Sequence, residues 1–218
     1  MRLQSAIFDL DGTLVDSMPC WNTLAINLLK ELGYEPEPGL PDKLRVLSTP
    51  NTAAYLKKTY NMTESEPEII RMIEERIEDF YRNQVEAKPG IPRFLSLLKM
   101  EGVWMCVATA TDRRLVELAL KRTGLSDYFR FILTCPEVGK SKDSPEIFER
   151  ALRRLRSTLK DTVVFEDSIV AIRTAKEAGF RVAGIYDTTA EADQAEIEAI
   201  SDYYIRSFEE MFTSETLE

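Results

Sequence analysis

The sequence predicts an α/β fold, a doubly wound parallel sheet with an all-helical segment inserted near its start. From residue 91 onward, short apolar runs alternate with helical patterns, which is the order expected of a parallel sheet covered on both faces. Between residues 16 and 87 several stretches show helical spacing and no strand pattern occurs. Several apolar runs end on polar or acidic residues, and ligands bind beyond the carboxyl ends of strands in such sheets.

The first apolar run, residues 6–8, ends on a pair of aspartates. Asp9 and Asp11 lie on the same side if the chain stays extended between them, and Gly12 then ends the extended geometry. Two neighbouring carboxylates repel each other unless a cation lies between them or one keeps its proton. The pair therefore indicates a metal site or a nucleophile beside an acid/base. A polar turn is the plain alternative, but it explains Asp11 and Gly12 without explaining Asp9.

The inserted segment, residues 16–87, predicts three helices. Apolar residues recur at helical spacing over 21–32, 51–60 and 66–80, and the many Glu and Arg residues of the third helix predict a solvated face with ion pairs. We expect residues 1–15 and 88–218 to form the sheet-containing core and residues 16–87 to form a separate helical unit.

The remaining strands are predicted by apolar runs that precede helix starts. The run 103–108 ends at Thr109, and Asp112 follows as the cap of a helix over 113–123. Ser144 is expected to cap a helix that begins with Pro145. The run 161–165 repeats the opening pattern and ends on two acids. Further strands are expected at 131–134, 182–185 and 203–205.

Composition excludes several classes of function. The chain has 218 residues, a net charge of −9 and no histidine, so histidine-based triads and the usual zinc sites are excluded. The acidic balance argues against nucleic acid as a partner, and no apolar run reaches membrane length. The three cysteines lack metal spacing and are typical of thiols in a reducing cytoplasm.

The segment Asp9–Thr13 resembles the opening motif of the haloacid dehalogenase superfamily in its phosphatase form, and the match continues to Ser17. Thr109 matches the second motif of that family, a hydroxyl residue at the end of a strand. Lys142 is the best match to the third motif, with Lys140 as the alternative, although Asp143 stands where the family commonly has proline. Glu166 and Asp167 match the acidic fourth motif, so the resemblance spans residues 9–168.

The resemblance implies a set of roles for these residues. Mg²⁺ would be held by the carboxylates of Asp9 and Asp167 and the backbone carbonyl of Asp11, with Glu166 as a further candidate. Asp9 would be the nucleophile and Asp11 the acid/base. The phosphoryl group would be held by the remaining residues, which are Thr109, the amide of Ala110, and Lys142.

The expected function is therefore a Mg²⁺-dependent phosphatase that acts on a small phosphorylated metabolite, with sugar phosphates as one candidate class. The chain looks most similar to β-phosphoglucomutase-like and phosphoglycolate phosphatase-like members. In the resemblance the helical insert is a cap that closes over the site.

Three alternatives within the superfamily are weaker. A mutase would use an arginine in a cap loop, and Arg45 is the only candidate for that residue. The segment Gly12–Thr13 argues against a dehalogenase. A phosphonate hydrolase would need a cap lysine, and the sequence singles out none of the candidates Lys43, Lys57 and Lys58.

A phosphoryl-accepting receiver module is the alternative from another class of protein. Receivers share the doubly wound sheet, an acceptor aspartate, a threonine and a lysine. They are shorter than this chain, however, and lack a helical insert after the first strand.

Overall fold

The computed structural model describes residues 3–44, 47 and 49–212, which form two compact units. The first unit comprises Met1–Asp16 and Val85–Glu218, and the second comprises Ser17–Gln84. Each unit has a hydrophobic interior of its own. That the expected segment 16–87 acts as a separate domain in the working protein stays a prediction.

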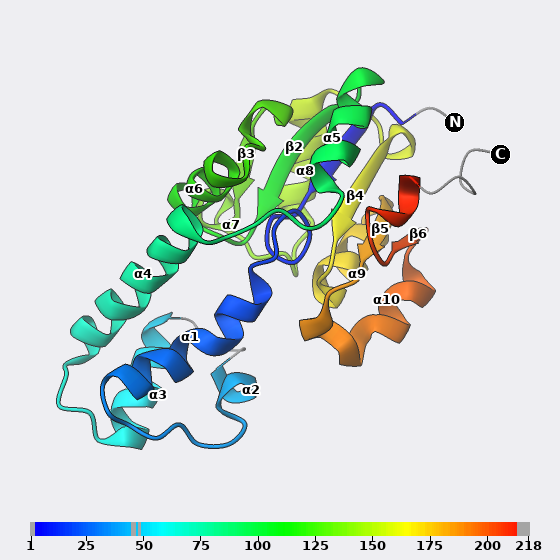
Figure 1. The fold of residues 1–218 in the computed structure, drawn as a ribbon. Helices are drawn as coiled ribbons and strands as arrows, with labels where there is room; N and C mark the ends of the chain where they lie inside the picture. Colours follow the sequence, from blue (N-terminus) through cyan, green and yellow to red (C-terminus); the bar gives the residue numbers. More distant parts are fainter. Residues whose placement is uncertain (1–2, 45–46, 48, 213–218) are drawn as a thin grey trace. The chain divides into compact units, whose positions relative to one another are not determined.

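The first unit is built on a parallel sheet (Figure 1). Within the described residues the sheet has six strands in the order β3-β2-β1-β4-β5-β6, and every neighbouring pair is parallel. The predicted fold class is therefore confirmed. The strands are β1 (Ser5–Phe8), β2 (Trp104–Thr109), β3 (Ile132–Thr134), β4 (Thr162–Glu166), β5 (Arg181–Ile185) and β6 (Tyr203–Ile205).

The strand order reverses beside β1, which determines where a ligand can bind. From β1 the chain builds β2 and β3 on one side and then returns to build β4, β5 and β6 on the other. The carboxyl ends of β1, β2 and β4 therefore lie next to one another. This arrangement is the switch point at which open α/β sheets form their sites.

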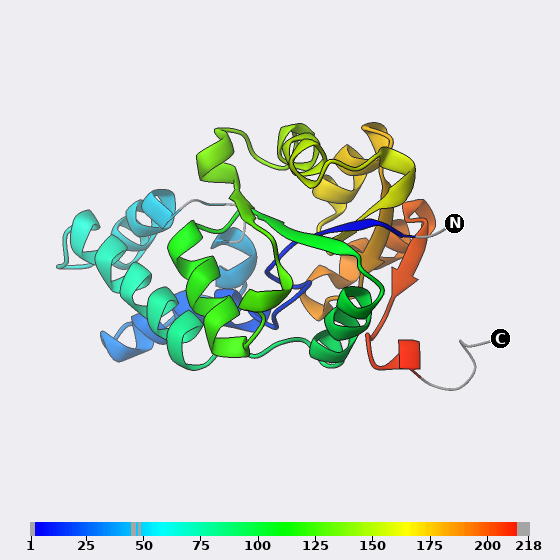
Figure 2. The same ribbon diagram turned by 90° about the horizontal axis from the view of Figure 1, so that it is seen from above.

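Alternating side chains of the central strands cover the two faces of the sheet. On one face Ile7 and Val164 pack in a buried cluster with helices α8 (Glu146–Leu155) and α9 (Ile169–Glu177). On the other face Phe8 stacks on Phe165, and both rings contact Phe94 of α5 (Ile91–Met100). Figure 2 shows the sheet between these helices. Burial of each large apolar side chain stabilises such a core by about 1.5–3 kcal/mol.

The other helices of the first unit connect the strands at their ends. They are α6 (Arg113–Thr123), α7 (Cys135–Val138) and α10 (Gln194–Ile200), with short 3₁₀ turns at Ser126–Tyr128, Leu159–Asp161, Thr188–Asp193 and Glu210–Phe212.

The predicted start of the helix after Lys142 was wrong by one residue. Pro145, not Ser144, is the N-cap of α8, because its carbonyl accepts the first helical hydrogen bond from the amide of Glu149. The amide of Ser144 donates instead to the carbonyl of Ser141, so Ser144 belongs to the preceding turn.

The second unit contains helices α1 (Met18–Glu31), α2 (Leu40–Leu44), α3 (Thr49–Tyr60) and α4 (Glu66–Asn83). Leu28, Leu56 and Ile73 from three of these helices are buried in its interior. The longer helices match the predicted ones, whereas α2 lies in a stretch where the sequence showed no pattern. A helix of five residues is too short to display helical periodicity, and Pro41 in its first turn is compatible with helix geometry.

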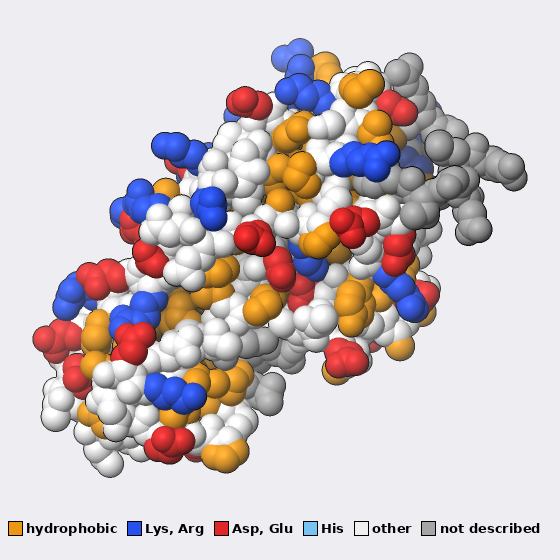
Figure 3. All heavy atoms as spheres, in the orientation of Figure 1, with side chains coloured by type: hydrophobic (Ala, Val, Ile, Leu, Met, Phe, Trp, Pro, Cys, Tyr) orange, Lys and Arg blue, Asp and Glu red, His pale blue; other side chains and the backbone are white. Residues whose placement is uncertain are grey.

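The solvent face of α4 carries the predicted ion pairs. Arg71 bonds Glu75 at 3.0 Å and Arg82 bonds Glu78 at 2.5 Å, each one helical turn apart. Acidic and basic side chains lie close together over this helix in Figure 3. Such exposed pairs contribute only about 0.3–0.5 kcal/mol each, so the buried face of α4 supplies most of its stability.

The segments that leave and re-enter the first unit pair with each other. Val15 forms an antiparallel bridge with Ala87, and the amide of Lys88 donates to the carbonyl of Leu14 at 2.9 Å. The Lys88 side chain is further held by the carboxylate of Asp187 at 2.9 Å. The two ends of the helical segment are therefore anchored side by side on the first unit.

Two features of composition can be located in the described part of the chain. Cys106 and Cys135 are buried and Cys20 is partly buried, and all three are free thiols. Among the described helices, none combines the length and the apolar character needed to cross a membrane.

Candidate active site

Three buried acids meet at the carboxyl ends of the adjacent strands β1 and β4. Asp9 follows β1, Glu166 is the last residue of β4, and Asp167 follows it. One carboxylate oxygen from each lies within 4.8 Å of the others. The amide of Asp9 donates to the carbonyl of Phe165 at 3.0 Å, which extends the strand pairing into the site and fixes the position of Asp9.

Lys142 brings a positive charge into this acid cluster, which we define as Asp9, Glu166 and Asp167. Its Nζ lies 2.5 Å from Oδ1 of Asp9 and 2.7 Å from Oε2 of Glu166. Burial would lower the pKa of Lys142, but the two adjacent carboxylates raise it above its usual value, so the amine stays protonated. Of the two lysines that the sequence left open, Lys142 thus lies at the acids, whereas the side chain of Lys140 is exposed.

The acid cluster has more negative charge than Lys142 can offset. Burial, with repulsion from Asp9, raises the pKa of Glu166 to about 7. Burial, followed by repulsion from Glu166 and Asp9, also raises the pKa of Asp167 well above its usual value. A divalent cation would relieve both effects, since three ionised carboxylates beside one ammonium leave two negative charges. Clustered carboxylate oxygens are the ligands that hard cations such as Mg²⁺ prefer, so the residues present fit this metal.

The turn after β1 holds Asp167 in position. Gly12 adopts a positive φ of 76°, and a β-carbon at this position would collide with the carboxylate of Asp167. The hydroxyl of the buried Thr13 donates to Oδ1 of Asp167 at 3.1 Å. Glycine is therefore required here for both its backbone conformation and its lack of a side chain.

Threonines at the end of β2 face the turn after β1. The hydroxyl of Thr111 donates to Oδ2 of Asp11 at 2.5 Å, and the hydroxyl of Thr109 accepts a 3.1 Å hydrogen bond from the amide of Thr111. Thr109 is buried, and the next residue, Ala110, is exposed. The side chain of Asp11 therefore contacts Thr111. Strand β1 ends at Phe8, before both aspartates, and Gly12 has the positive φ of a turn, as the sequence predicted.

Sequence reasoning assigned no role to Thr13 or Thr111. Thr13 lies within the opening motif, but nothing in its position showed that it would bond an acid at residue 167. Thr111 looked like part of a helix start. The one local signal for Thr13 was its position directly before the apolar pair Leu14–Val15, which suggests that it is buried. A buried hydroxyl needs a hydrogen-bond partner.

The candidate residues for a mutase or a phosphonate hydrolase lie in the second unit or outside the described residues. Arg45, the mutase candidate, lies outside the described residues. Lys57 donates to the backbone carbonyls of Met62 and Glu64, just after the end of its helix. These bonds hold the turn that follows the helix. Lys43 pairs with Glu37 at 3.0 Å, and Lys58 is exposed.

Comparison with known proteins identifies the family. Residues 6–185 match the family model described as haloacid dehalogenase-like hydrolase. This chain belongs to the haloacid dehalogenase-like hydrolases. The family resemblance drawn from the four motifs is therefore confirmed.

Relatives within the haloacid dehalogenase-like hydrolases are named as phosphatases. A phosphorylated carbohydrates phosphatase of Thermotoga maritima is 25% identical over 84% of this chain and 85% of its own length. A phosphoglycolate phosphatase of Rhodobacter capsulatus is 29% identical over 79% of this chain and 80% of its own. Together with the family, these relatives show that the chain is a phosphoric monoester hydrolase.

Solved structures share the fold. A Thermotoga maritima protein provisionally named as a β-phosphoglucomutase superposes with a TM-score of 0.85, at 24% identity and with 96% of each chain covered. At this identity the likeness supports the architecture alone.

The approach of Gly12 to Asp167 leads to a first prediction. Gly12→Ala should lower turnover by about 10²-fold, because the new methyl group displaces a carboxylate of the acid cluster. The control is Gly124→Ala, since Gly124 has a similar φ of 72° but open space around its α-carbon. Gly124→Ala should lose about 1–2 kcal/mol of stability from backbone strain and keep full turnover, whereas Gly12→Ala should lose more, because strain is joined by the collision with Asp167. Equal turnover in the two variants would contradict this account of Gly12.

The two lysines give a matched pair of variants. Lys142→Met should lower turnover by about 10²- to 10³-fold, because it removes the ammonium group beside Asp9. Lys140→Met should have little effect, because that side chain is exposed. Melting temperatures measured in excess Mg²⁺ would show that both variants are folded. A larger loss in Lys140→Met would assign the role to the other lysine.

Proposed function

We propose that this chain is a Mg²⁺-dependent phosphatase that hydrolyses a small phosphorylated carbohydrate through an aspartyl-phosphate on Asp9. The observation that carries the proposal is the ion pair between Asp9 and the largely buried Lys142 beside the acid cluster. A carboxylate in that setting is fixed in place and its charge is partly offset, so it can approach an anionic phosphoryl group.

The carboxylates of Asp9 and Asp167 would hold Mg²⁺, with the backbone carbonyl of Asp11 as a third ligand and Glu166 as a further candidate. When bound, the ion would offset the negative charge that otherwise keeps a phosphate ester away from carboxylates. Glu166 already bonds Lys142 and the amide of Ser168, so its carboxylate also serves to hold the lysine.

The reaction would proceed in two displacements. In the first, an Asp9 oxygen forms a bond to phosphorus while the bond from phosphorus to the ester oxygen breaks, and Asp11 donates a proton to the departing alkoxide. In the second, Asp11 accepts a proton from a water molecule, which attacks phosphorus and releases Asp9. The hydrogen bond from Thr111 orients the Asp11 carboxylate for both transfers.

Phosphate binding would use the end of β2. The hydroxyl of Thr109 and the amide of Ala110 lie after a strand and before α6, where backbone amides favour an anion. Lys142 would offset the negative charge on Asp9 and on the phosphoryl oxygens during the transfer. Positioning and electrostatics would supply most of the rate.

The named relatives support a substrate class. The Thermotoga maritima relative is named for phosphorylated carbohydrates, which supports a sugar or sugar-alcohol phosphate for this chain. The free thiols support a reducing, cytoplasmic setting.

A panel of phosphorylated metabolites tests this function. Purified protein with Mg²⁺ should release inorganic phosphate from p-nitrophenyl phosphate over many turnovers and from at least one carbohydrate phosphate with a higher kcat/KM. A mutase would isomerise a sugar phosphate without releasing phosphate, and a receiver would stop after one phosphorylation per chain. Either of these outcomes would replace the proposal.

We further propose that residues 16–87 act as a cap that selects the substrate. The paired segments at Val15 and Ala87 would serve as hinges. Hinge motion requires a change of backbone conformation at only a few residues, and these two short segments join residues 16–87 to the first unit. Adding a beryllium fluoride complex with Mg²⁺ should favour the closed form and protect residues 15–16, 40–52 and 87–89 from hydrogen exchange. Protection confined to the sheet strands would rule out a role as a lid.

A further inference from the structure

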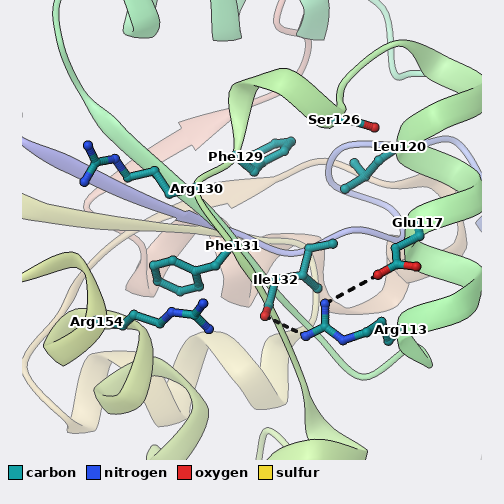
Figure 4. Close-up of a pocket in the computed structure, with 9 residues that line it drawn as sticks. All are labelled: Arg113, Glu117, Leu120, Ser126, Phe129, Arg130, Phe131, Ile132 and Arg154. Carbon is teal, nitrogen blue, oxygen red and sulfur yellow. Dashed lines mark hydrogen bonds and ion pairs between the residues drawn. The ribbon is translucent and has the colours of Figure 1, made fainter.

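A separate cavity lies at the free edge of the sheet, beside β3. Its volume is about 300 Å³, and it is formed by α6, the turn that follows it, β3 and the end of α8 (Figure 4). None of its lining residues belongs to the acid cluster or to the 109–111 segment. They are Arg113, Glu117, Leu120, Ser126, Phe129, Arg130, Phe131, Ile132 and Arg154.

Positive charge dominates this cavity, although the whole chain carries a net charge of −9. Three arginines line it against the single acid Glu117. Arg113 is already bonded to Glu117, to Glu137 and, at 2.9 Å, to the carbonyl of Ile132. The cavity therefore holds more cationic charge than its own acid can balance.

Two of these arginines are held by aromatic rings instead of carboxylates. The guanidinium of Arg154 lies 4.1 Å from the ring centre of Phe131, and that of Arg130 lies 3.5 Å from the ring centre of Trp104. In the described part of the chain neither has an acidic partner. A guanidinium that stacks on a ring is fixed in orientation while its N–H groups stay free to bind an anion.

The arrangement of the side chains identifies where an anion would lie. In Figure 4 the guanidinium groups of Arg154 and Arg113 extend toward each other from opposite sides, and the carbonyl oxygen of Ile132, which accepts a hydrogen bond from Arg113, lies between them, whereas Arg130 points away. An anion here would accept its hydrogen bonds from Arg154, because the Arg113 nitrogen that faces it already donates to Ile132 and Glu137. A phosphoryl group carries up to two negative charges and pairs strongly with a guanidinium group.

The sheet edge itself is unsuited to pairing with another chain. Strand β3 has three residues, and the guanidinium of Arg113 already occupies the carbonyl of Ile132. Short edge strands covered by a charged side chain resist the addition of a further strand. A small molecule is therefore the better occupant.

We propose that this cavity binds a small phosphate monoester or inorganic phosphate, with Arg154 as the principal donor. The cavity volume lies at the lower end of the range for small-molecule sites, which suits a ligand of this size. Phe129 and Leu120 would contact the organic part of an ester. The inference does not depend on the proposed function, because it concerns a different site.

The test measures phosphate binding to the metal-free protein at constant ionic strength. Titration with inorganic phosphate and, separately, with glycerol phosphate is followed through the backbone amide NMR signals of Phe131 and Ile132. Without metal, the acid cluster repels phosphate, so little binding is expected at the candidate active site. The amide signals of residues 109–111 report any phosphate that does bind there. We expect saturable shifts at Phe131 and Ile132. Tighter binding of glycerol phosphate would show that the organic part contributes, and equal binding would identify the phosphoryl group as the whole ligand.

The matched variants are Arg154→Gln and Arg153→Gln. Arg153 is the neighbouring residue on α8, does not line the cavity, and pairs with Glu146 and Glu149. Arg154→Gln should weaken binding about ten- to hundredfold, as expected for loss of a hydrogen bond to a charged group, and Arg153→Gln should not. Both side chains are exposed, so both variants should melt like the wild type. Absence of shifts in the wild type, or equal binding by the two variants, would overturn the proposal.

Discussion

Asp9→Asn is expected to lower turnover by at least about 10³-fold while the protein stays folded. An amide of the same shape cannot attack phosphorus, and residues that act as a unit in catalysis show losses of this order. The fold should survive because the amide oxygen can still accept the hydrogen bond from Lys142, and one of the mutually repelling charges is removed. Initial rates on p-nitrophenyl phosphate and the melting temperature measure the two effects.

Asp127→Asn is the control for this variant. Asp127 is exposed and lies in a 3₁₀ turn outside the acid cluster, so its loss should leave turnover near that of the wild type. Near-normal turnover in folded Asp9→Asn would show that Asp9 is not the nucleophile.

Removal of metal is expected to abolish activity and to change how stability depends on pH. Without a cation the pKa of Glu166 is raised to about 7, and that of Asp167 is raised as well. The folded state then binds more protons than the unfolded state, so the stability of the chelated protein should fall as pH rises from about 5 to about 7. Mg²⁺ competes with those protons, so its affinity should rise over the same interval.

Thermal unfolding with and without Mg²⁺ measures this linkage. At a hundredfold excess of Mg²⁺ over its dissociation constant, the stabilisation should be about 2.7 kcal/mol. Asp167→Asn should lose most of the Mg²⁺-dependent rise in melting temperature, whereas Glu177→Gln, an exposed acid on α9, should keep it. Full activity in chelator, or an unchanged Mg²⁺ effect in Asp167→Asn, would show that these acids do not hold the metal.

The sheet could be predicted because its strands are short apolar runs that end on characteristic residues. The run before Asp9 and the run before Glu166 were recognisable from hydrophobicity alone, and the parallel arrangement of the sheet followed from the alternation with helices. The five-residue helix α2 could not be predicted, because it is shorter than two turns.

The site was predictable where the signal is local and not where it depends on long-range contact. Asp9, Glu166 and Asp167 stand at strand ends, and parallel strands place such ends together. The contact between Thr13 and Asp167 joins residues 154 positions apart and leaves no trace in the sequence. The choice between Lys140 and Lys142 likewise needed the path of the loop before α8.

The cationic cavity illustrates the same limit. Arg113, Arg130 and Arg154 come from three separate elements, and nothing in their spacing connects them. Only the fold brings α6 and α8 to the same edge of the sheet beside β3.

Chemical trapping of the intermediate tests the central claim most directly. The enzyme is mixed with p-nitrophenyl phosphate and Mg²⁺, quenched in acid within one turnover, and reduced with borohydride, which converts an aspartyl-phosphate to homoserine. Mass spectrometry of the peptide that contains Asp9 and Asp11 then locates the modified residue. The account predicts homoserine at position 9 and unmodified aspartate at position 11, and no modification without Mg²⁺. Turnover with no modification at Asp9, or modification of another residue, would contradict it.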